Sequence, residues 1–307
     1  MPQRERTTVE AVSERPALLL SIDFEDWHQL VHRRLGLSGW DKPHEALERE
    51  TGGLLDLLDE LDARATFFLL GMTAANHRDL VAEIVRRGHD PACHGHAHAR
   101  VYDQTPDEFR ADLDRALNVI EEVTGRRPVA YRAPAFSINR RTPWAYELLA
   151  DAGFRYDSSQ YDSPRVPDRI TAIPDHPYRL TLGGRELWEL PLARWGPLPI
   201  GGGSYWRLIP VRILERGLRP FSVVYFHPYE FDPQPLRVRL PTTATTAQRL
   251  TSTRLRVWRN TGRPLVARRL RAVARSYRLV SYDQAYDDIH RLYGARTRAL
   301  SPEGVLI

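Results

Sequence analysis

Short apolar runs alternate with longer amphipathic runs along this chain of 307 residues. The first apolar run of strand length is Ala17–Phe24. Six others follow, at Ala65–Leu70, His89–His94, Val129–Arg132, Phe154–Asp157, Leu187–Leu190 and Ser222–His227. Segments with helical spacing separate several of these runs, at Glu45–Leu61, Arg78–Arg87, Pro106–Thr124 and Thr142–Ala152. This alternation predicts an α/β fold, a distorted (β/α) barrel of about seven parallel strands with helices outside.

The same pattern predicts the division of the chain. We expect a disordered leader over residues 1–16, one catalytic domain over residues 17–290 and a C-terminal tail over residues 291–307. The segment Asp162–Gly203 is rich in Pro and Gly and is predicted to form long loops over one face. No apolar run approaches the roughly 18 to 20 residues that a membrane span needs. The mixed charges of the first residues do not suit a signal peptide, so we expect a cytoplasmic protein.

The composition adds two constraints. Cys93 is the single cysteine, which excludes an intramolecular disulfide, and we interpret it as a small buried packing residue rather than a metal ligand. The net charge is +5, and Lys42 is the one basic residue that is not arginine or histidine. Arginines are dense from Arg249 to Arg298. We interpret them as a solvated face rather than a nucleic-acid surface, although they could attract acidic glycans or an anionic membrane.

Two clusters could bind a metal ion. Asp23-Phe24-Glu25-Asp26 follows the first strand directly, and its three carboxylates are tolerable together only if a cation or an arginine neutralises them. His94 and His98 lie four positions apart, which on a helical turn would direct both rings to one side. Two imidazoles at this spacing can share one metal ion, and neutral imidazole suits zinc and other late first-row metals.

Three further polar residues end predicted strands. Arg132 ends Val129–Arg132 and could hold a carboxylate ionised and oriented. Asp157 ends Phe154–Asp157, and His227 ends the apolar run that begins at Ser222. Because α/β barrels build their active sites at the carboxyl ends of the strands, these residues are predicted to meet the two clusters at one mouth.

Taken with these motifs, the chain resembles the polysaccharide deacetylases with a NodB-homology domain. The resemblance covers roughly residues 17–290. The motifs that carry it are Ala65-Thr66-Phe67-Phe68-Leu69-Leu70-Gly71, the His94-x-x-x-His98 motif with its lead-in from Gly88, and Arg132-Ala133-Pro134. It is most similar to the branch associated with exosortase-linked polysaccharide export. That likeness rests on Ile22–Trp27, Tyr131–Ser137, the glycines Gly201–Gly203 before Tyr205, and His227–Pro233.

The resemblance implies a divalent metal, usually zinc, held by one Asp and two His. Carried over residue by residue, the ligands are Asp26, His94 and His98. The family's usual Thr-Phe-Asp-Asp reads Asp23-Phe24-Glu25-Asp26 here, so Glu25 falls on the position of the catalytic base and Asp23 is a second choice for it. Arg132 would hold the base ionised, His227 would protonate the leaving amine, and Asp157 would orient His227. A backbone N–H near Arg132 is expected to help stabilise the oxyanion.

These roles predict an enzyme that removes acetyl groups from N-acetylated amino sugars of a polysaccharide or oligosaccharide. Aromatic residues near the expected mouth favour stacking on sugar rings. They are Trp27, Tyr131, Trp188, Trp195, Tyr205, Trp206 and Tyr229. Two alternatives stay open: an amidohydrolase acting on a small nitrogen compound, and a non-catalytic carbohydrate-binding protein that kept the fold.

Overall fold

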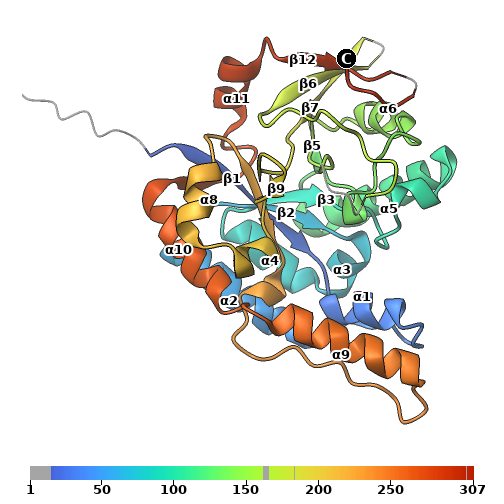
Figure 1. Ribbon diagram of the computed structural model, residues 1–307. Helices are drawn as coiled ribbons and strands as arrows, with labels where there is room; N and C mark the ends of the chain where they lie inside the picture. The colour runs from blue at the N-terminus through green and yellow to red at the C-terminus, as the bar shows by residue number, and fades with distance from the viewer. Residues whose placement is uncertain (1–14, 162–165, 183, 302) are drawn as a thin grey trace, which may run out of the picture.

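A barrel of parallel strands forms the centre of the molecule (Figure 1). In order around the barrel, its strands are β10 (Val223–Phe226), β1 (Ala17–Phe24), β2 (Thr66–Leu69), β3 (Asp90–Cys93), β4 (Ala130–Tyr131), β5 (Tyr156–Asp157) and β7 (Arg185–Glu189). The chain beyond β7 closes the ring, because Leu192 pairs in parallel with Val223 of β10 and the Ala193 N–H donates to the Val223 carbonyl. This architecture confirms the predicted α/β fold, and each of the seven expected strands is present.

The computed structural model describes residues 15–161, 166–182, 184–301 and 303–307. The expected leader at 1–16 therefore lies almost wholly outside the described residues. The expected tail at 291–307 does not separate from the fold. Its strand β12 (Thr297–Ala299) pairs with β6 (Tyr178–Leu182), which in turn pairs antiparallel with β7. The fold thus continues past the boundary that we had placed at residue 290.

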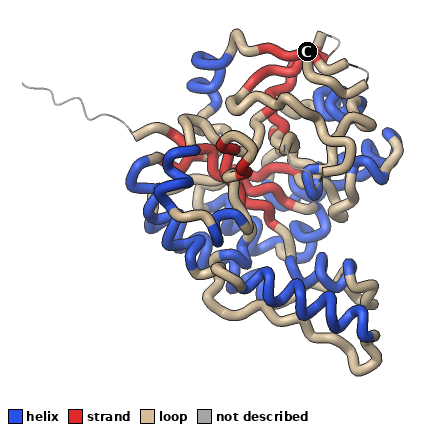
Figure 2. Tube along the Cα trace, viewed as in Figure 1, coloured by secondary structure: helices blue, strands red, loops and turns tan. Residues whose placement is uncertain are grey.

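Helices cover the outside of the barrel, and strands run through the middle (Figure 2). The helices before β10 are α1 (Trp27–Arg34), α2 (Ala46–Glu60), α3 (Gly71–Asn76), α4 (Arg78–Arg86), α5 (Pro106–Thr124), α6 (Trp144–Asp151), α7 (Tyr205–Leu208) and α8 (Val211–Gly217). After β10 come α9 (Thr246–Asn260), α10 (Leu265–Ser276), strand β11 (Arg278–Val280), which pairs with β1, and α11 (Tyr286–Tyr293). Short 3₁₀ turns lie at η1 (Val101–Asp103), η2 (Pro134–Phe136) and η3 (Pro228–Glu230).

The segment predicted as loops, Asp162–Gly203, contains more strand than expected. Besides β7 it holds β6 and a two-stranded hairpin, β8 (Arg194–Trp195) with β9 (Leu198–Pro199). Gly202 then lies against β10 with φ 138°, and a Cβ there would fall 1.9 Å from the Tyr225 carbonyl oxygen. This close approach requires glycine and explains one position of the Gly201–Gly203 run.

Alternation along β1 determines which residues reach the barrel interior. Leu18, Leu20, Ile22 and Phe24 belong to the core that packs against the surrounding helices. Leu19 belongs instead to the inner cluster, and successive side chains on a strand point to opposite faces. Asp23, two pleats further on, therefore points into the barrel at its carboxyl-terminal mouth.

Candidate metal centre and active site

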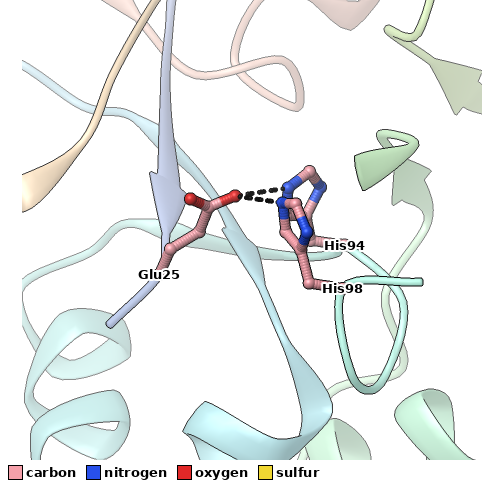
Figure 3. A group of neighbouring side chains, drawn as sticks. All are labelled: Glu25, His94 and His98. Atoms are coloured by element: carbon pink, nitrogen blue, oxygen red, sulfur yellow. Dashed lines mark hydrogen bonds and ion pairs between the residues drawn. The ribbon is translucent and has the colours of Figure 1, made fainter. Parts of the chain in front are cut away.

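Glu25 and two histidines meet at the mouth of the barrel (Figure 3). Glu25 lies just beyond β1, where its N–H donates to the Asp23 carbonyl and closes a tight turn (3.0 Å). One carboxylate oxygen, Oε1, lies 3.0 Å from Nε2 of His94 and 3.0 Å from Nε2 of His98. Burial raises the pKa of Glu25, but His98 and His94 outweigh that effect, so that its pKa lies well below the ordinary value. The carboxylate is therefore ionised and faces both imidazoles.

The two histidines reach this position from a loop, not from a helical turn as we had expected. The residues after β3 have no helical hydrogen bonding, and Gly95 and His98 both adopt left-handed backbone, with φ of 74° and 54°. A Cβ on Gly95 would lie 2.8 Å from Oδ2 of Asp112, which accepts the N–H of His96. The loop thus doubles back and brings both rings together, as Figure 3 shows.

The donor set suits a divalent metal ion. The Arg132 carbonyl lies 2.7 Å from Nδ1 of His94 and so takes its ring N–H, which leaves a lone pair on Nε2. The ligating atoms of Glu25, His94 and His98 all lie within 4.8 Å of one another. Zinc at about 2.0 to 2.2 Å from such nitrogen and oxygen ligands leaves neighbouring ligand atoms roughly 3.3 Å apart. The distances of 3.0 Å from Glu25 to each imidazole fit this spacing closely.

Asp26, which we had expected as the third ligand, is instead the N-cap of α1. Its Oδ1 accepts the N–H groups of His28 and Gln29 at 3.0 and 3.3 Å, and its Oδ2 accepts the N–H of His44 at 2.8 Å. Burial raises the pKa of Asp26 to about 6, against the opposing effect of these hydrogen bonds. The Asp26 carboxylate is thus occupied by backbone donors, and Glu25 rather than Asp26 faces the two histidines.

Arg132 binds Asp23 deep in the barrel. Its Nη1 lies 2.6 Å from Oδ1 of Asp23, and both side chains are almost fully buried. Its Nε and Nη2 groups are also used: Nε donates to the Ser158 carbonyl, and Nη2 donates to Ser158 Oγ, Ser21 Oγ and the Tyr282 hydroxyl. Burial lowers the pKa of Arg132, but Asp23 and the other partners raise that pKa by more than burial lowers it. The guanidinium therefore stays charged. Arg132 is therefore a rigid cation whose carboxylate partner is Asp23 rather than Glu25.

The backbone N–H groups of Arg132 and Ala133 are already bonded, so an oxyanion donor near Arg132 would have to come from another residue of this segment. The Arg132 N–H donates to the Cys93 carbonyl at 3.0 Å, and the Ala133 N–H donates to Ser159 Oγ at 2.8 Å. Cys93 itself is buried as predicted, and burial raises the pKa of its thiol to about 12.

His227 completes the mouth from the end of β10. Its Nε2 lies 3.6 Å from Oε2 of Glu25, and its Nδ1 lies 3.3 Å from Oε2 of Glu230. Arg207 holds the other oxygen of Glu230 at 2.5 Å. Burial lowers the pKa of His227, but the bond to Glu230 and the nearby carboxylates raise it above its ordinary value overall. The protonated imidazole is thus favoured.

Asp157 is not the partner of His227 that we had predicted. Its two oxygens accept the hydroxyl and the N–H of Ser159, at 2.6 and 3.0 Å. It also lies opposite Glu189, its register partner on β7. Burial raises the pKa of both carboxyls, and Asp157 raises that of Glu189 further, so the pair retains a proton. The pair belongs to the buried strands β5 and β7.

Most of the aromatic residues proposed to stack on sugar are in the core. Trp27, Tyr131, Trp188, Trp206 and Tyr229 are all at most 4% exposed, so a sugar could not reach their faces without repacking. Trp195 is 43% exposed on the β8–β9 hairpin, and Tyr205 is half-buried at the start of α7. The half-buried Tyr225, whose ring centroid lies 5.7 Å from that of His227, was not among the residues singled out from the sequence.

Sequence reasoning also missed the partners of the polar residues. Glu230 lies three positions after His227, a short-range spacing that could have revealed it. Arg207, Ser21, Ser158 and Tyr282 are brought in by the fold from distant segments, and no local pattern marks them.

Two family models match the chain, and they meet at the site. Residues 40–156 match the polysaccharide deacetylase family, and residues 158–287 match a family described as a domain of unknown function (DUF3473). His94, His98 and Arg132 come from the first region, and His227 and Glu230 come from the second. The carboxylates Asp23 and Glu25 precede both.

Relatives and solved structures agree with this result. A peptidoglycan deacetylase-like protein of Gibberella zeae is 31% identical over 151 residues, covering 47% of this chain and 44% of that protein. The peptidoglycan deacetylase of Helicobacter pylori is 30% identical over 114 residues, covering 37% of this chain and 38% of that protein. The chain thus spans less than half the length of these curated relatives.

The crystal structure of a candidate polysaccharide deacetylase from Mycobacterium smegmatis has the same fold, with a TM-score of 0.61 and 23% identity over 91% of this chain and 92% of that one. Residues 40–156 therefore belong to a polysaccharide deacetylase domain with the NodB-homology fold, which the DUF3473 region follows in the chain.

Proposed function

We propose that this protein is a metal-dependent hydrolase that removes N-acetyl groups from amino sugars of a polysaccharide. The observation that carries the proposal is the position of Glu25, with one oxygen 3.0 Å from both His94 and His98 and the other 3.6 Å from His227. Ligating atoms of Asp23, Glu25 and His227 also lie within 4.8 Å of one another. A metal site, a carboxylate and an imidazole thus face one small space.

In this proposal Glu25, His94 and His98 hold the metal ion, and zinc suits two imidazoles and one carboxylate best. When bound there, the ion would polarise the acetyl carbonyl and the attacking water and stabilise the charge that develops on the carbonyl oxygen. This assignment replaces Asp26 by Glu25 as the carboxylate ligand.

Asp23 is the proposed general base, because it is the remaining carboxylate at the mouth. The buried guanidinium of Arg132 holds its Oδ1, which leaves Oδ2 to accept a proton from water. Glu25, which we had ranked first as base, has the geometry of a ligand instead. Its Oε1 faces two ring nitrogens at once, and a base needs a free oxygen toward the water.

His227 is the proposed general acid for the leaving amine. Glu230 holds Nδ1, so Nε2 faces the space beside Glu25 and Asp23 and can deliver its proton there. Arg207 is a positioning residue in this scheme, since it contacts Glu230 and keeps its carboxylate fixed. The base and the acid thus approach the same space from β1 and from β10.

The proposed substrate class is a polymer or oligomer of N-acetylated amino sugars. Two relatives are described as a peptidoglycan deacetylase or similar to one, and the half-buried Tyr225, whose ring centroid lies 5.7 Å from that of His227, offers aromatic surface for a sugar ring. The DUF3473 match is compatible with the exosortase-associated branch, and we propose that this chain belongs to it.

Acetate release from an N-acetylated chitooligosaccharide tests the proposal. We expect release by the zinc-loaded protein, loss after chelation, and recovery with Zn²⁺ or Co²⁺. Full release by protein shown to be metal-free by elemental analysis would overturn the mechanism. Turnover of a small amide but not of any oligosaccharide would favour the amidohydrolase alternative, and binding of the sugar without release by metal-loaded protein would favour a binding protein.

A further inference from the structure

Helix α9 exposes apolar side chains to solvent along most of its length. Leu250, Val257 and Trp258 are 67%, 59% and 44% exposed. Together with the exposed Arg254 they stand at positions i, i+4, i+7 and i+8, so these four side chains share one face of the helix. We call these four residues the outer face of α9. Isolated exposed apolar residues are common, but three on one helical face form a patch that needs a reason.

The opposite side of α9 fastens the helix to the body of the protein beside α1, as Figure 1 shows. Leu255 packs against the cluster of Trp27, Val31 and Leu35, and the Gln248 side chain donates to the Leu35 carbonyl at 2.8 Å. Near the end of the helix, Arg259 donates to the Tyr229 hydroxyl. The outer face therefore belongs to a firmly packed helix and is presented outward beside the elements that carry the site.

The stretch of sequence that contains α9 carries one sign of charge. Between Asp232 and Asp283 the sequence has no acidic residue. Its arginines there are Arg237, Arg239, Arg249, Arg254, Arg256, Arg259, Arg263, Arg268, Arg269, Arg271, Arg275 and Arg278. Arg254 and Arg256 are exposed, and neither side chain has an ion pair or hydrogen bond within the part of the chain that the structure describes. Their charge is thus available to an anionic partner.

We propose that the outer face of α9 binds the surface of an anionic lipid bilayer, with Leu250, Val257 and Trp258 entering the headgroup region and the arginines contacting lipid phosphates. An amphipathic helix with Trp and Leu on one side and arginine beside them is the pattern of an interfacial helix.

Aliphatic side chains gain from hydrocarbon but offer no stacking surface to a sugar, which favours lipid over an acidic glycan. A second copy of the chain would bring like charges together. None of the described helices is long and apolar enough to cross a membrane, so the inferred attachment is peripheral. The proposal does not depend on the proposed function.

Co-sedimentation of the full-length protein with vesicles tests this inference. We expect binding to vesicles of phosphatidylcholine and phosphatidylglycerol at 3:1, weaker binding at high salt, and little binding to phosphatidylcholine alone. Replacing Leu250, Val257 and Trp258 together by Gln should lower the partition coefficient about tenfold or more. The pair Arg254→Gln and Arg256→Gln should lower the partition coefficient about 25-fold, since each arginine near such a surface contributes roughly fivefold.

Matched variants distinguish binding by the outer face of α9 from a general effect of net charge or of exposed apolar surface. Arg110→Gln with Arg212→Gln removes the same charge from exposed positions outside α9, and Leu292→Gln removes an exposed leucine from α11. Both should bind vesicles like the unaltered protein, and all variants should release acetate from a soluble oligosaccharide at the same rate. The inference fails if the α9 variants bind vesicles normally. It also fails if a soluble acidic glycan binds equally well regardless of the apolar substitutions, or if the face proves to be a dimer contact by light scattering.

Discussion

At the scale of single residues, the proposed base and the proposed ligand are only two positions apart in the sequence. Asp23 lies within β1 and is held by Arg132, whereas Glu25 lies on the turn beyond it and faces His94 and His98. Asp23→Asn should keep the metal and lower kcat by about 10² to 10⁴, because it removes the proposed proton acceptor. It also leaves the buried Arg132 without its carboxylate partner, so kcat is compared after urea unfolding has shown that the variant is folded. Glu25→Gln should release the metal, with an affinity loss greater than the roughly 10- to 100-fold typical of outer partners. Metal content and kcat of both variants in one buffer decide between the roles.

Asp26 provides the matched control for that pair. Asp26→Asn should retain the metal and most of kcat, because its oxygens bind backbone N–H groups rather than the site. Replacing Oδ2 by an amide removes the acceptor for the His44 N–H and should cost on the order of 1 kcal/mol in the free energy of unfolding. Loss of metal from this variant, with metal retained by Glu25→Gln, would restore the assignment based on family resemblance.

The pKa of His227 gives a second residue-scale prediction. Burial lowers the pKa of His227, but the hydrogen bond to Glu230 and the nearby carboxylates raise that pKa by more. The proposed acid therefore stays protonated to a higher pH than a free imidazole does. Glu230→Gln removes that charge and should lower the pKa of His227. The basic limb of the kcat–pH profile should then move to lower pH, because the acid loses its proton earlier. His227→Ala should lower kcat by about 10² to 10⁴ at every pH and keep the metal. A basic limb that does not move in Glu230→Gln would assign that limb to another group.

These residues also show how far sequence reasoning reaches. Strict alternation along β1 places Asp23 and Glu25 on the same side and Asp26 opposite, and the structure follows that alternation. The family pattern pointed instead to Glu25 and Asp26 as neighbours in the site. Alternation predicted the arrangement correctly because the strand stays regular through Phe24. A helix begins at Trp27, and the carboxylate of Asp26 forms the N-cap of that helix. Glu230 was within reach of local spacing, but Arg207 was not.

At the scale of elements, the seven barrel strands were predictable because short strand-like runs alternate with amphipathic helical segments along the chain. Strands β6, β8 and β9 were not, since they lie in a segment whose Pro and Gly residues resemble loops. The helical turn expected at His94–His98 was wrong for a related reason. A spacing of four residues also arises in a loop when left-handed residues such as Gly95 and His98 reverse the chain.

The contact between Gly202 and β10 yields a prediction for an element. Gly202→Ala would place a Cβ 1.9 Å from the Tyr225 carbonyl and must displace one of the two segments. We expect a loss of at least about 2 kcal/mol in the free energy of unfolding and a lower kcat, because Tyr225 lies two positions before His227 on the same strand.

Gly52→Ala in the middle of α2 is the control. Nothing lies within 4 Å of the methyl group that this substitution would add, so it should stabilise the protein by roughly 0.5 to 1 kcal/mol. Urea unfolding of both variants measures the contrast, and an unchanged Gly202→Ala would mean that the barrel does not close there.

At the scale of the whole molecule, the site depends on segments from the entire chain. Asp23 comes from β1 and Glu25 from the turn just after it, His94 and His98 follow β3, and His227 follows β10. Tyr282, which contacts Arg132, comes from after β11. The DUF3473 region therefore supplies the proposed acid, and closes the barrel through Leu192 and Val223. The polysaccharide deacetylase region alone would lack both the closing strand and the acid, so we expect the two regions to fold as one unit.

A buried carboxyl links the stability of this unit to pH. Glu50 on α2 is 1% exposed, and its Oε1 has no hydrogen-bond partner among the described residues. Burial, with Asp232 and Asp26 nearby, raises the pKa of Glu50 from its ordinary value of 4.5 to about 8. Between these two values the folded state binds more protons at Glu50 than the unfolded state does, so the contribution of Glu50 to stability is lost as the pH rises from about 4.5 through about 8. Glu50→Gln should therefore match the parent near pH 4.5 and exceed it by on the order of 4 kcal/mol at pH 8.5. Glu48→Gln, at an exposed position on the same helix, should show no such divergence in urea unfolding at the two pH values. If the parent and Glu50→Gln keep the same difference at both, Glu50 is already ionised in the folded protein and must have a partner such as Arg49 or Arg263, which both lower its pKa.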